Sequence, residues 1–132
     1  MKEGLLWLTI VFFCKIISGE IPSTTVYEDE DVKAFLDISQ ATPGHTLLVP
    51  KKHVQDIFEY DDELAQKVLT KIPMIARAVR NFDPAIQGLN IVNNNGEVAY
   101  QSVFHSHIHF IDRKSTRLNS SHMPKSRMPS SA

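Results

Sequence analysis

Apolar and polar positions divide the chain into a body with clear periodicity and two ends without it. In the body, β-prone runs at 23–27 and 32–36 flank the acidic run 28–31, which predicts a hairpin with a solvated turn. A Thr-Pro-Gly turn signal then precedes a third predicted strand at 45–50. The first half of the body therefore indicates neighbouring antiparallel strands.

The longest helical pattern begins with carboxylates at 61–63, where the positive end of a helix dipole favours them. Apolar residues then recur at steps of three and four up to Val79, which predicts one amphipathic helix. Pro73 lies inside this pattern and predicts a kink or an end to the first half of the helix. A shorter helical stretch of one or two turns is predicted over 54–60.

Two more strands are predicted at 89–92 and 102–111, with the strong turn signal Asn-Asn-Asn-Gly between them. Strands, then helix, then strands predict an α+β fold. We expect a mostly antiparallel sheet of about five strands with one long and one short helix. The length of 132 residues, with 42% hydrophobic and 22% charged residues, suits one globular domain and argues against a disordered chain. The single cysteine, Cys14, excludes an intramolecular disulfide and any multi-cysteine zinc site.

The N-terminal segment 1–12 is atypical. Its apolar run is shorter than the roughly 20 residues that span a bilayer, so we expect no membrane span. A lysine before a short apolar core resembles a secretory signal, but no small-x-small cleavage site follows it. A signal, a chimeric start and a buried first strand remain the alternatives for this segment. The domain itself is expected to cover 13–111.

The C-terminal segment 112–132 is basic, with five Lys/Arg against one Asp, and has no apolar period. Its back-translation resembles a widely used sequencing-library adapter read in frame. We therefore interpret 112–132 as a non-native tail, and finding it encoded in the source genome would refute this. The preceding 1–111 holds nine Lys/Arg against fourteen Asp/Glu, so it offers no electrostatic reason to bind nucleic acid.

Three histidines at alternate positions, His105, His107 and His109, carry the candidate chemistry. On a strand they share one face, and the residues between them share the other. A neutral imidazole is both a nucleophile and a proton carrier near physiological pH, and mutual repulsion keeps the three from all being charged. A zinc site of histidine ligands, a solvated face or tag, and a satisfied core are the alternatives.

The His-x-His-x-His strip resembles the signature of the histidine triad (HIT) family of nucleotide hydrolases and transferases. Other motifs that resemble the family follow one another in its order, at 13–22, 35–39, 43–45, 49–53, 93–96 and 101–105. The resemblance covers 13–111 and is greatest to small bacterial hydrolases similar to adenosine 5′-monophosphoramidase. The transferase branch usually has glutamine where this chain has His109, so the resemblance favours the hydrolases.

The resemblance implies a nucleotide hydrolase that cleaves at the α-phosphate of nucleoside phosphoramidates or dinucleoside polyphosphates. It implies a cytoplasmic homodimer that takes a purine nucleotide, passes through a nucleotidyl-histidine intermediate and needs no cofactor. Neither a nucleic acid nor a membrane is an expected partner. The alternative is a non-catalytic nucleotide- or metal-binding module.

The resemblance also implies a role for each histidine. His107 attacks the α-phosphorus, His109 holds a phosphate oxygen, and His105 buttresses the strip. His45, at the start of the third predicted strand, orients the strip by hydrogen bonding.

The remaining implied contacts are with the phosphate, the ribose and the base. Ser102 and Asn94 supply neutral donors to the phosphate and the leaving group. Asp37 accepts from the ribose hydroxyls. The base pocket is lined by the apolar side chains of Ile38, Phe13 and Ile16.

A structural zinc ion, which many bacterial relatives bind through Cys-x-x-Cys, is not expected here. Val11 stands where the first cysteine would be, so Cys14 and His45 are candidate ligands only if a residual site persists. His53 follows two lysines and is interpreted as a surface or helix-start residue outside the site.

Overall fold

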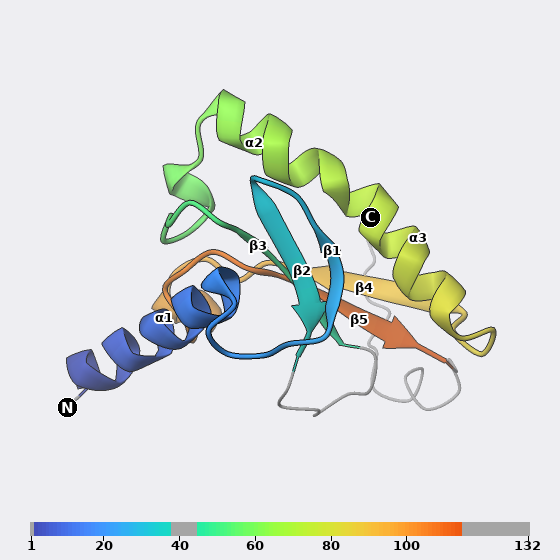
Figure 1. Ribbon diagram of the computed structural model, residues 1–132, viewed down its shortest axis with the longest axis horizontal. Helices are drawn as coiled ribbons and strands as arrows, with labels where there is room; N and C mark the ends of the chain where they lie inside the picture. The colour runs from blue at the N-terminus through green and yellow to red at the C-terminus, as the bar shows by residue number, and fades with distance from the viewer. Residues whose placement is uncertain (1, 38–44, 115–132) are drawn as a thin grey trace.

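The computed structural model describes residues 2–37 and 45–114 (Figure 1). Its helices are α1 (Lys2–Ser18), α2 (Asp62–Val68) and α3 (Ile72–Phe82), and its 3-10 turns are η1 (Ile57–Glu59), η2 (Leu69–Lys71) and η3 (Glu97–Ala99). Its strands are β1 (Thr25–Glu28), β2 (Val32–Leu36), β3 (Thr46–Pro50), β4 (Gly88–Val92) and β5 (Ile108–Arg113).

The strands form one sheet in the order β1-β2-β3-β5-β4, and each neighbouring pair is antiparallel. The predicted α+β class and the antiparallel sheet are therefore confirmed. Side chains alternate between the two faces of the sheet along each strand, and both faces carry buried apolar residues. One packs against α2 and α3 through residues such as Ala34 and Phe110, and the other packs against α1 through Phe35 and Val49.

Helix α1 differs from what the sequence predicts for the N-terminal segment. A buried first strand is wrong there, because Lys2–Ser18 is helical. Gly19 follows with φ 90°, a conformation that only glycine adopts readily, and its N–H bonds the carbonyl of Ile16 at 3.2 Å. The apolar run carries no polar face, so its sequence lacks the amphipathic period that reveals a helix.

The long helical pattern folds as two helices joined by η2. Pro73 lies in the first turn of α3, where its missing N–H costs no helical hydrogen bond. The prediction that this proline ends the first half of the helix is confirmed. Asp61 caps the start of α2, since its side chain accepts from the N–H of Leu64 at 2.8 Å.

The fifth strand is shorter at its start than the sequence predicts. Only the stretch from Ile108 is a strand, and residues 102–107 approach it as irregular backbone. At its end β5 continues to Arg113, which pairs with Gly88 of β4. The strand thus extends past the boundary predicted at 111, and positions 115–132 of the predicted tail lie outside the described residues.

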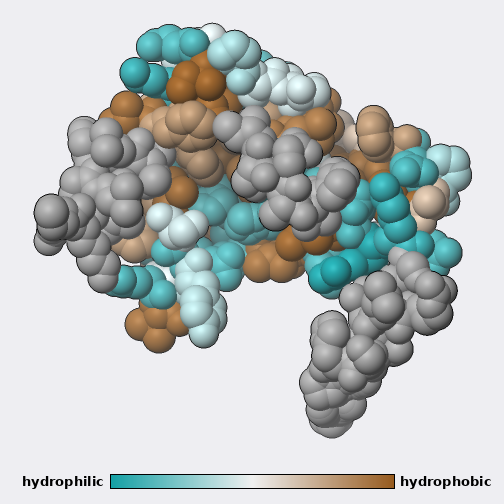
Figure 2. Space-filling model, turned by 90° about the horizontal axis from the view of Figure 1, so that it is seen from below, coloured by the Kyte–Doolittle hydropathy of each residue, from teal (hydrophilic) through white to brown (hydrophobic). Residues whose placement is uncertain are grey.

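None of the helices in residues 2–37 and 45–114 combines the length and the apolar character needed to cross a bilayer. On the side seen in Figure 2, hydrophobic patches lie beside hydrophilic ones over the described surface.

Candidate active site

The histidine strip lies where β5 begins, beside the middle of the sheet and the end of α1. Two ring pairs define it: the centroids of His107 and His109 are 4.8 Å apart, and those of His45 and His109 are 5.0 Å apart. The intervening Ile108 and Phe110 pack into the core on the α2–α3 face. The predicted alternation therefore holds, although the strand begins only at Ile108.

His107 has the geometry of a nucleophile. Its Nδ1–H donates to the backbone carbonyl of His105 at 2.8 Å, and a carbonyl can only accept. In the neutral ring the lone pair is therefore on Nε2. Burial lowers the pKa of His107 from its usual 6.5, so the ring is neutral at pH 7 and Nε2 can attack.

His105 is fully buried and anchors the strip to β3. Its Nε2–H donates to the carbonyl of Pro50 at 2.8 Å, which leaves a lone pair on Nδ1. Burial, reinforced by the neighbouring His53 and His107, lowers the pKa of His105 to about 4. A ring that is neutral and bonded on both sides serves as a rigid support.

His53 completes that support, so its exclusion from the site is wrong. Its Nδ1 lies 2.9 Å from Nδ1 of His105, and because the His105 atom must accept, His53 donates. The ring of His53 is exposed, which agrees with the predicted surface position, but one edge reaches the buried triad. No spacing rule links a histidine after Lys-Lys to a motif some fifty residues later, so the place of His53 in the family-like segment 49–53 is the one signal that the sequence offered.

His45 and His109 form a second linked pair on the other side of His107. Nε2 of His45 lies 2.9 Å from Nδ1 of His109, and Nδ1 of His45 lies 3.5 Å from Oδ2 of Asp37. Burial, with the nearby His107 and His45, lowers the pKa of His109 to about 4, so this ring is neutral at pH 7. Asp37 thus lies against the strip through its contact with His45.

Two proton arrangements fit the pair. If His109 donates to His45, its own Nε2 holds a lone pair. If His45 is protonated and faces the Asp37 carboxylate, it donates to Nδ1 of His109, and Nε2 of His109 carries a hydrogen. Only the second arrangement gives His109 a donor for a phosphate oxygen.

Phe13 of α1 lies over the strip. Its ring meets His107 edge-on at 5.3 Å between centroids and is tilted against His105 at 6.1 Å. Ile16, one turn later, is only 1% exposed and packs with Phe35, Leu47 and Val49. Of the predicted base-pocket residues, Phe13 is therefore beside the chemistry, Ile16 is core beneath it, and Ile38 lies outside the described residues.

Two amide side chains, those of Asn93 and Gln101, connect the loop after β4 to its surroundings, and the sequence pattern indicates no individual role for either. Nδ2 of Asn93 donates to the carbonyl of His107 at 2.9 Å. The buried Gln101 donates to the carbonyl of Gln55 at 2.7 Å and accepts from the N–H of Gly96 at 2.7 Å. These bonds hold the loop against His107 and against the segment that contains Gln55.

The two predicted neutral donors differ in their surroundings. Asn94 uses Nδ2 within the loop, donating to the carbonyl of Ala99 at 2.8 Å. Ser102 is exposed on the irregular backbone that leads to His105. The structure therefore gives Asn94 a role in holding the loop and leaves Ser102 accessible to a ligand.

A closed zinc site does not fit the side chains that the structure describes. The described residues include no group of three or more His, Cys, Asp or Glu side chains arranged around a metal, and Cys14 is exposed. A structural zinc ion needs four protein ligands, and the candidate pair Cys14 and His45 supplies two.

Fold and site together define a small α+β protein whose antiparallel sheet presents neutral imidazoles from a His-x-His-x-His strip. The HIT domain model matches residues 18–116, so the chain belongs to the histidine triad (HIT) family. The predicted family is thereby confirmed.

Known proteins similar to this chain agree with that assignment. Protein hit of Bacillus subtilis is 60% identical over 102 residues, covering 76% of this chain and 69% of that protein. Adenosine 5'-monophosphoramidase HNT1 of Candida albicans is 35% identical over 105 residues, covering 77% of this chain and 69% of the enzyme. A crystal structure of a HIT family member from Bacillus subtilis has a TM-score of 0.74 at 46% identity, covering 90% of this chain and 97% of that one.

Proposed function

We propose that this protein is a nucleotide hydrolase that cleaves at the α-phosphate of nucleoside phosphoramidates or dinucleoside polyphosphates. Its relatives include a phosphoramidase, and family membership supports hydrolase activity at a coarse level. The observation that carries the finer proposal is the Nδ1–H bond of His107 to the His105 carbonyl, which directs the lone pair to Nε2.

The first step forms a bond between Nε2 of His107 and the α-phosphorus and breaks the bond from that phosphorus to the leaving group. His107 keeps its Nδ1 hydrogen, so the adduct ring is positively charged and stays bonded to the His105 carbonyl. The leaving amine or phosphate takes a proton from the His45–His109 pair.

The second step returns the enzyme to its starting state. Water attacks the phosphorus, the bond to Nε2 of His107 breaks, and the nucleoside monophosphate leaves. The proton that water releases goes back to the His45–His109 pair, so charge and protons balance over the cycle. Histidine side chains supply all of this chemistry, with His107 as a neutral nucleophile and the His45–His109 pair as the proton donor, and we propose that no metal or other cofactor is required.

Nucleoside recognition belongs to the same proposal. The apolar face of Phe13 suits a purine ring, and the carboxylate of Asp37 suits a ribose diol. The exposed Ser102 offers a hydroxyl to the phosphate. We expect the protein to work in the cytoplasm.

We also propose a homodimer. Strand β4 ends the sheet, and among the described strands only β5 pairs with it, so its other edge can pair with a further strand. A groove between β4 and α3 runs beside this edge, lined by Ala76, Arg77, Arg80, Gln87, Gly88, Leu89 and Ile91. A second copy that extends the sheet would fill it.

The deciding experiment offers adenosine 5′-phosphoramidate and a diadenosine polyphosphate to the purified protein and follows AMP release. We expect turnover by the wild type, and loss of about 10⁴-fold or more in kcat in His107→Ala with AMP binding retained. Rapid quenching at alkaline pH should trap AMP on His107, detected by peptide mass spectrometry. An unmodified His107 during steady turnover would refute the nucleophile assignment.

Assays after treatment with a chelator distinguish the proposed hydrolase from a metal-binding module. Activity that survives exhaustive chelation supports the proposal. Stoichiometric metal in the purified protein, together with no hydrolysis of either substrate, would favour the metal-binding alternative instead.

A further inference from the structure

Lys33 is a buried lysine near the middle of the sheet. It lies on β2, pairs with Val49 of β3, and is only 6% exposed. Lysine is almost never this buried without a partner. Strand alternation puts it on the same face as Phe35, which is the face that α1 covers.

The partner of Lys33 is the end of a helix. Its Nζ donates to the backbone carbonyl of Ile16 at 2.8 Å. That carbonyl belongs to the last turn of α1, where carbonyls lack helical partners and the helix dipole is negative. Gly19 bonds the same oxygen at 3.2 Å, so the turn is held both by the chain itself and by a cation from the sheet.

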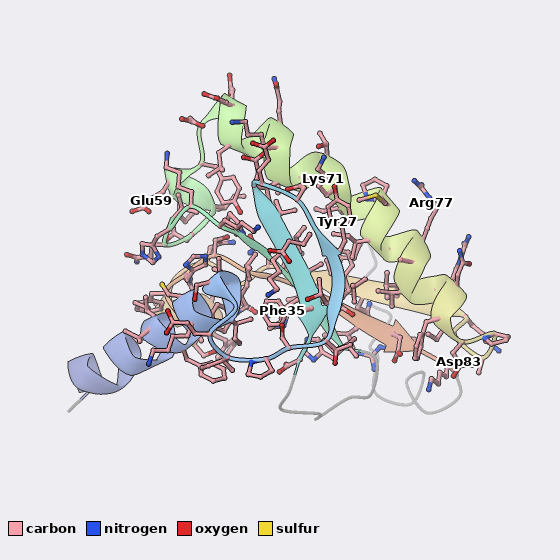
Figure 3. The ribbon with its side chains drawn as sticks, in the orientation of Figure 1. Tyr27, Phe35, Glu59, Lys71, Arg77 and Asp83 are labelled. Atoms are coloured by element: carbon pink, nitrogen blue, oxygen red, sulfur yellow. The ribbon has the colours of Figure 1, made fainter. Side chains whose placement is uncertain are left out.

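Phe13 lies on α1 one turn before Ile16, so it is coupled to the turn that Lys33 holds. The ring of Phe13 meets Phe35 edge-on at 6.3 Å and His107 edge-on at 5.3 Å. Phe35 lies between β2 and the end of α1 in Figure 3. A displacement of this end of α1 therefore moves Phe13 relative to the triad.

The groups that face the phosphate do not depend on α1 in this way. His107 and His109 are set by bonds to the His105 carbonyl and to His45, which belong to the sheet and to the backbone before β5. Loss of the Lys33 contact should thus affect the base pocket, while the side chains of His107 and His109 keep their positions.

We propose that Lys33 is a positioning residue whose buried ammonium locks the last turn of α1 and holds Phe13 in place as the wall that receives the base. Lys33 acts through Phe13 and sets affinity for the base rather than the chemistry at phosphorus. The nucleotide part of this inference rests on the proposed function, whereas the lock itself exists without a ligand.

The first measurement is amide hydrogen exchange in α1 without nucleotide. Lys33→Met keeps the apolar stem and removes the ammonium, and we expect exchange of the last-turn amides to quicken about tenfold. Lys33→Arg keeps a cation and should restore much of the protection. Lys67→Met removes one exposed, ion-paired lysine from α2 and is the matched control, with unchanged exchange in α1.

The second measurement compares ligands with and without a base. Lys33→Met should bind AMP about tenfold more weakly and ribose 5-phosphate as the wild type does, with KM for adenosine 5′-phosphoramidate raised and kcat nearly kept. Equal losses for both ligands, or unchanged AMP binding, would overturn the positioning role. Lys33→Leu, which suits the apolar surroundings, replaces Lys33→Met if that variant does not fold.

The two failures are distinguishable. If the wild type binds no AMP, the proposed function fails, and the exchange data alone decide whether the lock exists. If the wild type binds AMP but last-turn exchange does not change in Lys33→Met or Lys33→Leu, the lock is wrong and the proposed function stands.

Discussion

The Nδ1 atom of His53 lies 2.9 Å from the Nδ1 atom of His105 and joins an exposed ring to a fully buried one. Because Nε2 of His105 is committed to the Pro50 carbonyl, its Nδ1 can only accept in the neutral ring. His53 is therefore the donor that satisfies a buried nitrogen in the histidine strip.

His53→Ala should destabilise the protein by about 1–3 kcal/mol, the cost of an unsatisfied buried polar atom. Urea denaturation measures this. His53→Asn offers a side-chain N–H and should recover part of the loss. Lys52→Ala, at the exposed neighbouring position, is the control and should leave stability nearly unchanged. If His53→Ala is as stable as that control, the assigned donor is wrong.

Local patterns in the sequence predict the sheet well. The Thr-Pro-Gly and Asn-Asn-Asn-Gly signals separate strands that the structure contains, and the carboxylates at 61–63 mark the start of α2. Each of these features is determined within a few residues, by turn chemistry or by helix capping.

Contacts between distant residues are what the sequence does not reveal. Lys33 and Ile16, or His53 and His105, meet only because the fold brings separate elements together. The sequence gives Asn93 and Gln101 no individual role, yet the amide of Asn93 bonds the carbonyl of His107 and that of Gln101 bonds the carbonyl of Gln55. The triad itself is predictable because its members are two residues apart, which is a local relationship.

Tyr100 holds a strained backbone conformation. Its φ of 69° and ψ of 26° lie in the left-handed region, and its side chain is 86% exposed. This conformation costs an L-residue roughly 1–2 kcal/mol of conformational free energy, and it costs glycine almost none. Tyr100→Gly should therefore stabilise the protein by about 0.5–1 kcal/mol, after the greater freedom of glycine in the unfolded chain is subtracted.

The matched variant for that measurement is Tyr100→Ala, which removes the ring and keeps the Cβ. Equilibrium denaturation should place its stability near that of the wild type and below that of Tyr100→Gly. Equal stabilities for the glycine and alanine variants would show that backbone strain at this position is negligible.

Acid should weaken the fold through His105 and His109. The pKa values of His105 and His109 are lowered to about 4 by burial, against 6.5 in an unfolded chain. Above pH 6.5 both states are neutral and the two groups do not affect stability. Between pH 6.5 and 4 the unfolded chain takes up protons that the folded one refuses, so stability falls as the pH falls, by up to about 1.4 kcal/mol per pH unit for each group.

Urea midpoints from pH 7.5 to 5 test this, in a range where most carboxylates remain ionised. The wild type should lose stability steadily below pH 6.5, and His109→Gln should show a shallower loss because one titrating group is gone. A flat profile between pH 6.5 and 5 would contradict the lowered pKa values of these two rings.

The proposed homodimer makes the open edge of β4 the most informative surface to change. Ile91 is 45% exposed on that strand and lines the groove beside α3, and Arg77 projects from α3 in Figure 3. A lysine on an edge strand opposes pairing with a second strand, because the charge would be buried at the new interface. Ile91→Lys should therefore convert the dimer to a monomer in sedimentation velocity. Val98→Lys, at a 97% exposed position in η3, places the same charge on the loop after β4 and should leave the dimer intact. A monomeric wild type, or a dimeric Ile91→Lys variant, would show that the two copies do not pair through this edge.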